Sequence, residues 1–185
     1  MKASALEYAA RVIHDGGVIA YPTESCYGLG CSPKQHNSVR RVLRLKHRPF
    51  ANGVIIIGAT LSQVMPYISA CDPRLVERAR TTWPGPYTWL LPANTSVSRW
   101  LRGQHDSVAI RVTAHRGAAA LCRYAKQAIV STSANRHGYP PARSADEVRN
   151  RFGETIDYVL EGTVGGHSRP SEIRDALSNR VIRHG

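Results

Sequence analysis

Short apolar runs alternate with helical patterns along this chain of 185 residues. The runs predicted to be strands are residues 18–21, 54–57, 87–91, 107–112, 129–130, 158–160 and 181–182. Helices are predicted at residues 5–15, 37–46, 73–80, 116–126 and 144–153. Alternation of this kind is typical of an α/β domain built around a twisted sheet. Periodicity leaves open whether that sheet is parallel or mixed.

Residues at the helix ends support these boundaries. Gly16-Gly17 is a natural stop for the first helix. Pro49 ends the second, because the residue before a proline is pushed out of helical geometry. Asp72-Pro73 resembles an N-cap followed by proline at the first helical position, and Ser144 with Glu147 fits a capping box.

The overall composition predicts one globular domain over residues 1–185. Hydrophobic residues make up 42% and charged residues 21% of the chain, which is the balance of a folded globular protein. No run approaches the roughly 18 apolar residues of a membrane span, and the N-terminus lacks the apolar core of a signal peptide. We therefore expect a soluble, cytoplasmic protein with no membrane partner.

The cysteine spacing and the net charge argue against some classes of protein function and favour others. The four cysteines form no Cys-x-x-Cys pair, which argues against zinc fingers and thioredoxin-like motifs and favours buried reduced thiols. Lys and Arg number 25 against 13 Asp and Glu, for a formal charge of +12. Such an excess favours a polyanionic partner such as nucleic acid, although a solvated basic surface would also explain it.

The segment Lys46-His47-Arg48-Pro49 places two cations at the end of a predicted helix. They could bind a triphosphate together, with Arg48 gripping bidentately and Lys46 acting as a point charge. Favourable charge at a helix C-terminus is an equally good interpretation. The spacing alone does not choose between them.

Two further polar runs directly follow predicted strands. Residues 21–25, Tyr-Pro-Thr-Glu-Ser, could hold a small amphoteric ligand, or could be a turn stabilised by hydroxyl-to-backbone bonds. Residues 131–135, Ser-Thr-Ser-Ala-Asn, offer hydroxyls and an amide for phosphate, ribose or a base edge. Neither a Gly-x-Ser-x-Gly elbow nor a Walker loop surrounds them. Arg111, inside an apolar strand, could capture a ligand carboxylate or form a structural salt bridge.

In this order, the polar runs resemble the threonylcarbamoyl-AMP synthase family, also called the YrdC-like family, in its short bacterial single-domain form. The segments that carry the resemblance are residues 17–30, Lys46 with Arg48, Ser133 with Asn135, and residues 170–175. The resemblance implies a twisted, open, mixed α/β sheet with flanking helices and a basic concave face. It also implies synthesis of L-threonylcarbamoyladenylate from L-threonine, bicarbonate or CO2, and ATP, with release of pyrophosphate.

Site residues and partners follow from the same resemblance. Lys46 and Arg48 would be catalytic and, with Mg2+, would neutralise the leaving pyrophosphate. The other predicted ATP-binding residues are Ser133, Asn135, Arg143 and Ser171, and the predicted threonine-binding residues are Thr23, Arg111 and Ser131. No metal-ligating side chains are predicted. A downstream transferase would pass the threonylcarbamoyl group to tRNA, and the basic face would contact tRNA or double-stranded RNA.

The chain departs from the family pattern in two places. Two other functions are also compatible with parts of the sequence. Ser25 stands where many relatives have threonine, and residues 50–54, Phe-Ala-Asn-Gly-Val, replace a segment with a histidine that helps to bind threonine. The first rival is a non-catalytic RNA-binding protein of the same fold. The second is a sugar-phosphate enzyme like the dihydroxybutanone-phosphate synthases, which is disfavoured because there is no tight carboxylate cluster beyond Glu24.

Overall fold

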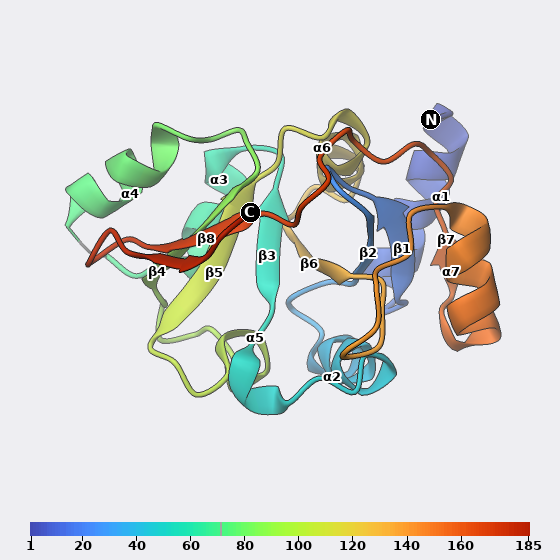
Figure 1. Ribbon diagram of the computed structural model, residues 1–185, viewed down its shortest axis with the longest axis horizontal. Coiled ribbons are helices and arrows are strands. Elements are labelled where there is room, and N and C mark those ends of the chain that lie inside the picture. Colours follow the sequence, from blue (N-terminus) through green and yellow to red (C-terminus); the bar gives the residue numbers. More distant parts are fainter. Residues whose placement is uncertain (71) are drawn as a thin grey trace.

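One twisted, open sheet of nine strands organises the chain (Figure 1). The computed structural model describes residues 1–70 and 72–185. The strands are β1 (Ile19–Pro22), β2 (Tyr27–Gly30), β3 (Ile55–Gly58), β4 (Tyr87–Pro92), β5 (Ser107–Val112), β6 (Ile129–Ser133), β7 (Tyr158–Val159), β8 (Glu172–Asp175) and β9 (Val181–Arg183). Their order is β7-β1-β2-β6-β3-β5-β4-β8-β9. The pairs β1–β7, β3–β5 and β4–β8 are parallel and the others antiparallel, so the predicted mixed α/β sheet is confirmed.

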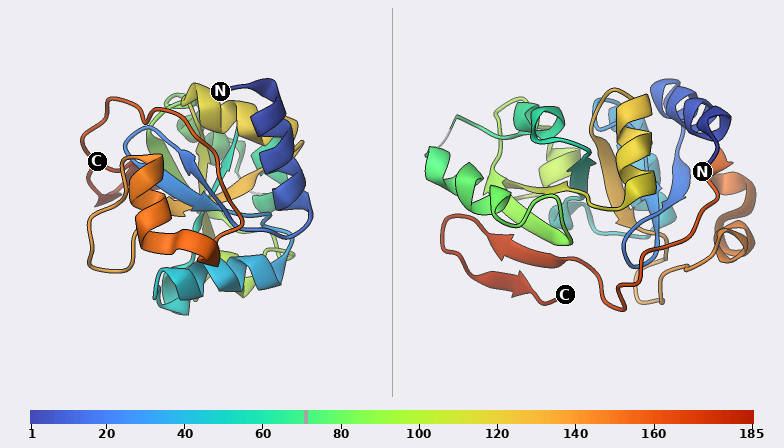
Figure 2. Two further views of the ribbon diagram at one scale, coloured as in Figure 1. Left: turned by 90° about the vertical axis from the view of Figure 1, so that its right-hand side faces the viewer. Right: turned by 90° about the horizontal axis from the view of Figure 1, so that it is seen from above.

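Helices flank this sheet. They are α1 (Ala3–His14), α2 (His36–Leu45), α3 (Leu61–Val64), α4 (Pro73–Arg80), α5 (Arg99–Arg102), α6 (Arg116–Tyr124) and α7 (Ala145–Phe152), with short 3-10 turns at Phe50–Asn52, Met65–Tyr67 and Gly153–Thr155. Helices α1 and α6 lie side by side against one face of the sheet (Figure 2). Helix α2 lies beside α5 at the lower edge of Figure 1. None of the helices in residues 1–70 and 72–185 is long and apolar enough to cross a membrane.

Two apolar clusters fill the interior. The smaller joins α1 and α6 to β1, β3 and β6, and it contains the buried Leu6, Ala9, Ala10 and Ile13 that share one face of the first helix. The larger cluster lies on the other face and joins α2, α4, α5 and α7 to the strands. Burial of these apolar side chains is the main force that holds the helices on the sheet.

The end signals read from the sequence act mostly as predicted. The Asp72 side chain caps α4 by accepting the backbone N–H of Arg74, and Ser144 caps α7 through the N–H of Glu147. The capping box is only half formed, because the Glu147 carboxylate accepts the N–H of Arg143 instead of that of Ser144. Helix α2 ends at Leu45, one residue earlier than predicted.

Several segments differ from the sequence-based prediction, and the short helices α3 and α5 were not predicted. Residues 27–30, for which no strand was predicted, form strand β2, in which Gly30 leaves room for the Tyr21 ring. A Cβ at Gly30 would lie 2.6 Å from Tyr21 Cε1. Residues 131–133, expected to follow a strand, continue β6. Strand β8 was not predicted within residues 170–175.

The expected buried thiols are found at Cys26, Cys31 and Cys122, all of which are free. The fourth, Cys71, lies outside the described residues.

Candidate functional site

A cleft of about 290 Å³ opens on the sheet face that also carries α1 and α6. Its floor contains Ile55 of β3, Ala109 of β5, Leu90 of β4 and Ser131 of β6. Ala109 is the cross-strand partner of Ile55 and of Leu90, and Ile55 is also the partner of Ser131. These four side chains therefore lie on the same face of the sheet. The floor is therefore a patch of sheet that the two helices leave open.

Strand alternation brings Arg111 into this cleft. On β5, Ser107, Ala109 and Arg111 line the cleft. The alternate residues Val108 and Ile110 belong to the larger apolar cluster on the opposite face. The apparently apolar strand of the sequence analysis is thus two-sided, and Arg111 stands on its polar side.

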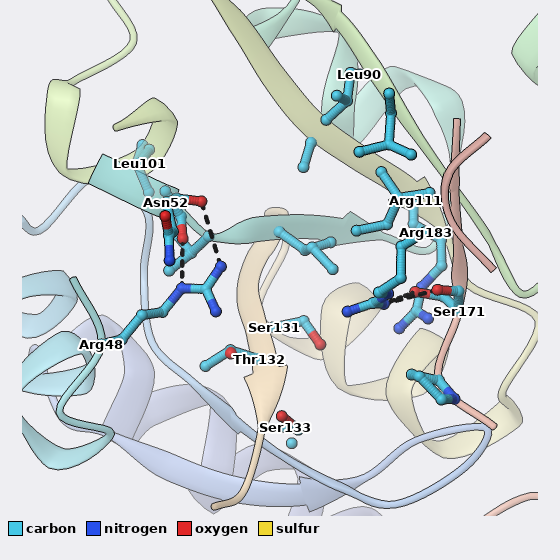
Figure 3. Close-up of a pocket in the computed structure, with 18 of the residues that line it drawn as sticks. Arg48, Asn52, Leu90, Leu101, Arg111, Ser131, Thr132, Ser133, Ser171 and Arg183 are labelled. Atoms are coloured by element: carbon cyan, nitrogen blue, oxygen red, sulfur yellow. Dashed lines mark hydrogen bonds between the residues drawn. The ribbon is translucent and has the colours of Figure 1, made fainter. Parts of the chain in front are cut away.

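Arg48 and Arg183 reach the cleft from opposite sides (Figure 3). Arg48 Nε donates to Gly53 O at 2.8 Å, and a terminal nitrogen donates to Asn52 O at 3.3 Å. Arg183 Nη2 donates to the backbone oxygen of Ser171 at 2.7 Å. Backbone carbonyls thus hold both guanidinium groups in place while leaving other N–H groups free for a ligand.

The cleft is strongly cationic. Four arginines, Arg48, Arg102, Arg111 and Arg183, line it, and the lining within the described residues contains no aspartate or glutamate. Burial lowers the pKa of Arg48. Burial, together with the charges of Arg48 and Arg111, also lowers the pKa of Arg183. An anion between these groups would relieve their mutual repulsion, so the cleft is suited to phosphate or carboxylate.

Lys46 does not line the cleft. Its side chain is buried, and Nζ donates to Asn135 O at 2.9 Å, to Asn135 Oδ1 at 3.0 Å and to Ser133 O. These three acceptors match the three N–H donors of an ammonium group. The Ser133 hydroxyl in turn donates to Asn135 Oδ1 at 2.6 Å and lines the cleft. The two cations of the run therefore separate: Arg48 faces the cleft, and Lys46 holds the Ser133–Asn135 loop behind it.

The turn after β1 places Thr23 on the cleft wall. Both the backbone N–H and the hydroxyl of Thr23 donate to Cys26 O, at 2.9 and 2.8 Å. This is the hydroxyl-stabilised turn that the sequence analysis considered as one alternative. Thr23 therefore stabilises this turn and also lines the cleft.

The remaining predicted site residues divide between the cleft and the surface. Ser171 lines the cleft, and its hydroxyl lies 3.0 Å from that of Thr88. Asn135 lies behind Ser133, outside the cleft lining. Arg143 is exposed and also lies outside the lining, and its backbone N–H donates to Glu147.

Arg111 satisfies both interpretations offered for it. One terminal nitrogen lies 3.3 Å from Glu24 Oε2, and the two side chains are only 7% and 8% exposed. A buried salt bridge therefore exists, and the same guanidinium borders the cleft. Burial raises the pKa of the Glu24 carboxyl, but the charge of Arg111 and the hydrogen bond from Thr113 outweigh it, so the net shift is downward.

Sequence reasoning missed Arg183, Arg102 and His105 in the lining. Arg183 lies in a short edge strand whose residues are all exposed, so no apolar pattern marked it. The carbonyl groups that hold Arg48 belong to residues 50–54, whose side chains gave no sign of this role. Every residue has a backbone carbonyl, so a pattern of side chains cannot predict which carbonyls hold Arg48.

Comparison with known proteins places these features in a family. The sequence model of the Sua5/YciO/YrdC family, described as telomere recombination, matches residues 11–185. A threonylcarbamoyl-AMP synthase from Nitrosococcus oceani is 49% identical over 175 residues, which cover 95% of each chain. A threonylcarbamoyl-AMP synthase from Methylobacillus flagellatus is 48% identical over 183 residues, which cover 99% of each chain.

A solved structure of a similar protein has the same fold. The crystal structure of P. abyssi Sua5 complexed with L-threonine superposes with a TM-score of 0.86 at 33% identity. The match covers 92% of this chain and 50% of that one, so this chain spans about half the length of P. abyssi Sua5.

Proposed function

The chain belongs to the Sua5/YciO/YrdC family, and we propose that it synthesises threonylcarbamoyl-AMP from L-threonine, bicarbonate or CO2, and ATP. Pyrophosphate is the second product, which makes the enzyme a nucleotidyltransferase. The relatives named as synthases, 48–49% identical over nearly their whole length, favour this catalytic function over a non-catalytic RNA-binding role. We also propose that residues 1–185 act as a single domain, since one sheet joins strands from β1 to β9.

The observation that carries the proposal is the cationic lining of the cleft. Four arginines line it without a carboxylate among the described residues, and Thr23, Ser131 and Ser133 line it as well. ATP and threonine bring the two kinds of anion that such a cleft would accept, a polyphosphate and a carboxylate. A sugar-phosphate enzyme built on an acidic metal site does not fit this lining.

In the proposed reaction, the threonine carboxylate binds Arg111, and Thr23 and Ser131 contact the rest of the amino acid. The neutral amine attacks the carbon of CO2 and releases a proton to the solvent, which gives an N-carboxylate. An oxygen of this new carboxylate attacks the α-phosphorus of ATP, and the bond to the bridging oxygen of pyrophosphate breaks. The protein contributes by holding the reactants together and in line, without a covalent intermediate.

Arg48 and Arg183 are placed to receive the phosphates, because they face one another across the cleft and keep free donors (Figure 3). Their charges would stabilise the negative charge that develops on leaving pyrophosphate. The Ser133 hydroxyl and Ser171 would contact the nucleotide, and Lys46 and Asn135 would act by holding Ser133. Arg143, which is exposed and outside the lining, receives no contact in this scheme.

Magnesium enters the proposal as part of the substrate, Mg·ATP. No group of three or more His, Cys, Asp or Glu side chains able to hold a metal occurs among residues 1–70 and 72–185. The cleft lining offers hydroxyls and cations, which suit the phosphates more than the metal ion. The phosphate oxygens of ATP would thus hold the ion.

Nucleic acid enters the proposal only as a partner. The product would pass to a transferase that modifies tRNA. The formal charge of +12 and the exposed Arg40 and Arg44 on α2 support contact with tRNA or double-stranded RNA.

The test is release of pyrophosphate by the purified protein with Mg·ATP, with L-threonine and bicarbonate each supplied or omitted. Release that requires both co-substrates is the expected result. Release without threonine, or none from a folded protein that still binds RNA tightly, would overturn the proposal in favour of another ATPase or an RNA-binding protein.

A further inference from the structure

Arg111 differs from the other cations at the cleft in how it is held. Arg48, Arg102 and Arg183 each donate to backbone carbonyls. The guanidinium of Arg111 is nearly fully buried, and its Nε has no hydrogen-bond partner among the described residues. Its close polar contact is the 3.3 Å approach to Glu24. A buried guanidinium with unused donors depends on that single carboxylate for its position.

Glu24 is itself fixed on the side away from Arg111. Its Oε1 accepts the hydroxyl of Thr113 at 2.7 Å, so the carboxylate cannot swing without losing that bond. The Thr113 oxygen also accepts the backbone N–H of His115 at 3.2 Å, which ties the array to the start of α6. Three contacts in series, His115 to Thr113, Thr113 to Glu24 and Glu24 to Arg111, thus connect a helix end to the guanidinium in the cleft.

A strap, residues 162–167, locks the backbone of Glu24 from the other side. Gly165 N–H donates to Thr23 O at 2.9 Å, and His167 N–H donates to Glu24 O at 3.2 Å. The approach is so close that a Cβ on Gly165 would lie 2.5 Å from Glu24 O. Only a residue without a side chain lets the strap lie against this turn.

Glu24 does not reach the substrate itself. It is absent from the cleft lining and borders a second cavity beneath the strap, whereas Arg111 lines the cleft. The carboxylate of Glu24 therefore meets the cleft through its contact with Arg111.

We propose that Glu24 is a positioning residue, which holds the Arg111 guanidinium where it receives the carboxylate of the amino-acid substrate. This inference rests on the proposed function, because it takes the ligand of Arg111 to be L-threonine. With Thr113 behind it, Glu24 sets the affinity for the amino acid and leaves that for ATP unchanged. On ligand binding the guanidinium lies between two carboxylates, one fixed by the fold and one brought by threonine.

The experiment compares Glu24→Gln with Glu77→Gln, a matched change in an exposed ion pair on α4. Calorimetry measures the Kd for L-threonine, for L-threoninamide and for Mg·ATP. We expect Glu24→Gln, which keeps the shape of the side chain and removes the negative charge 3.3 Å from Arg111, to weaken threonine binding by about tenfold. Binding of threoninamide, which has no carboxylate, and of Mg·ATP should not change, nor should any affinity in the control.

A merely structural role would weaken all three ligands together, and this outcome would overturn the proposal. Tighter binding of threonine would also overturn it, because it would show that Glu24 competes for the guanidinium instead of placing it. Should Glu24→Gln fail to fold, Thr113→Val removes the hydrogen bond and keeps both charges. The same selective loss, of a few-fold, is then expected. Failure of the proposed function would look different, since the unaltered protein would then bind no threonine.

Discussion

Lys46 Nζ lies 3.0 Å from the side-chain oxygen and 2.9 Å from the backbone oxygen of Asn135. With Ser133 O as a third acceptor, these contacts occupy all the donors of an ammonium group that is only 4% exposed. The lysine therefore organises the loop whose Ser133 hydroxyl reaches the cleft. Under the proposed function, its effect on a nucleotide would be transmitted through that loop.

Replacing Lys46 with methionine should accordingly damage stability and nucleotide binding together. The change leaves buried oxygens of Ser133 and Asn135 without donors, and we expect the free energy of unfolding to fall by about 3 kcal/mol. The Kd for ATP should rise at least tenfold because the loop is no longer held. Urea unfolding and ATP titration measure the two effects. Lys34→Met, at an exposed lysine, is the control, and a stable variant with unchanged ATP affinity would contradict this role.

The protonation of Lys46 predicts how ATP affinity depends on pH. Burial, reinforced by the charge of Arg48, lowers the pKa of Lys46 to about 8. Below that pH the ammonium keeps its charge and its three donors, and as the pH rises through 8 it loses one donor and the charge. We therefore expect the Kd for ATP to increase between about pH 7.5 and 9. Nearby Cys26 should remain a neutral thiol over most of this range, because burial raises its pKa.

Measuring ATP binding instead of turnover separates this titration from that of the threonine amine, which must be neutral to react. In Lys46→Met the same pH range should leave ATP affinity flat. An unaltered protein with a flat profile would show that the carbonyl oxygens keep Lys46 charged.

The two arginines that face each other across the cleft should act on the nucleotide. Arg48→Ala and Arg183→Ala each remove a charged donor group, and we expect each to raise the KM for ATP by ten- to a hundredfold. Because Arg180 is exposed on the same β8–β9 hairpin, Arg180→Ala is a matched control. Initial rates with ATP varied at saturating threonine measure the effect. A rise confined to the KM for threonine would instead place these arginines on the amino acid.

The sequence predicted the helices and strands that have a regular pattern of apolar side chains. Apolar periodicity identified α1 and its buried face, and a short apolar run marked β5. The apolar pattern did not predict β2, because Gly28 and Gly30 interrupt it. At these two glycines the Tyr21 ring lies against the strand. Tertiary packing there overrides local propensity.

The candidate site was predictable only in part, for a similar reason. Thr23, Arg48, Arg111, Ser131, Ser133 and Ser171 were chosen from short motifs, and all of them line one cleft. The anchors of Arg48 are carbonyl groups at Asn52 and Gly53, and every residue has a carbonyl. Arg183 comes from the far end of the chain through the β4–β8 and β8–β9 pairings, which no local pattern encodes.

Gly103 links this backbone scaffold to the site. It has a φ of +68°, and a Cβ there would lie 2.1 Å from the carbonyl oxygen of Ala51, in the turn that precedes the two carbonyls that hold Arg48. Gly103→Ala should therefore combine backbone strain of roughly 1–3 kcal/mol with a clash that displaces the turn. We expect lower stability and weaker ATP binding in the same variant.

Gly153→Ala separates the two contributions to that result. Gly153 has a φ of +47°, and a Cβ there would have nothing within 4 Å, so the change adds backbone strain without a clash. It should lower the free energy of unfolding by no more than the strain itself and leave the Kd for ATP unchanged. Equal losses of ATP affinity in both variants would mean that the turn at residues 50–53 does not place Arg48. A loss confined to Gly103→Ala would show that the backbone of this turn, and not only the arginine, determines how the cleft binds its anion.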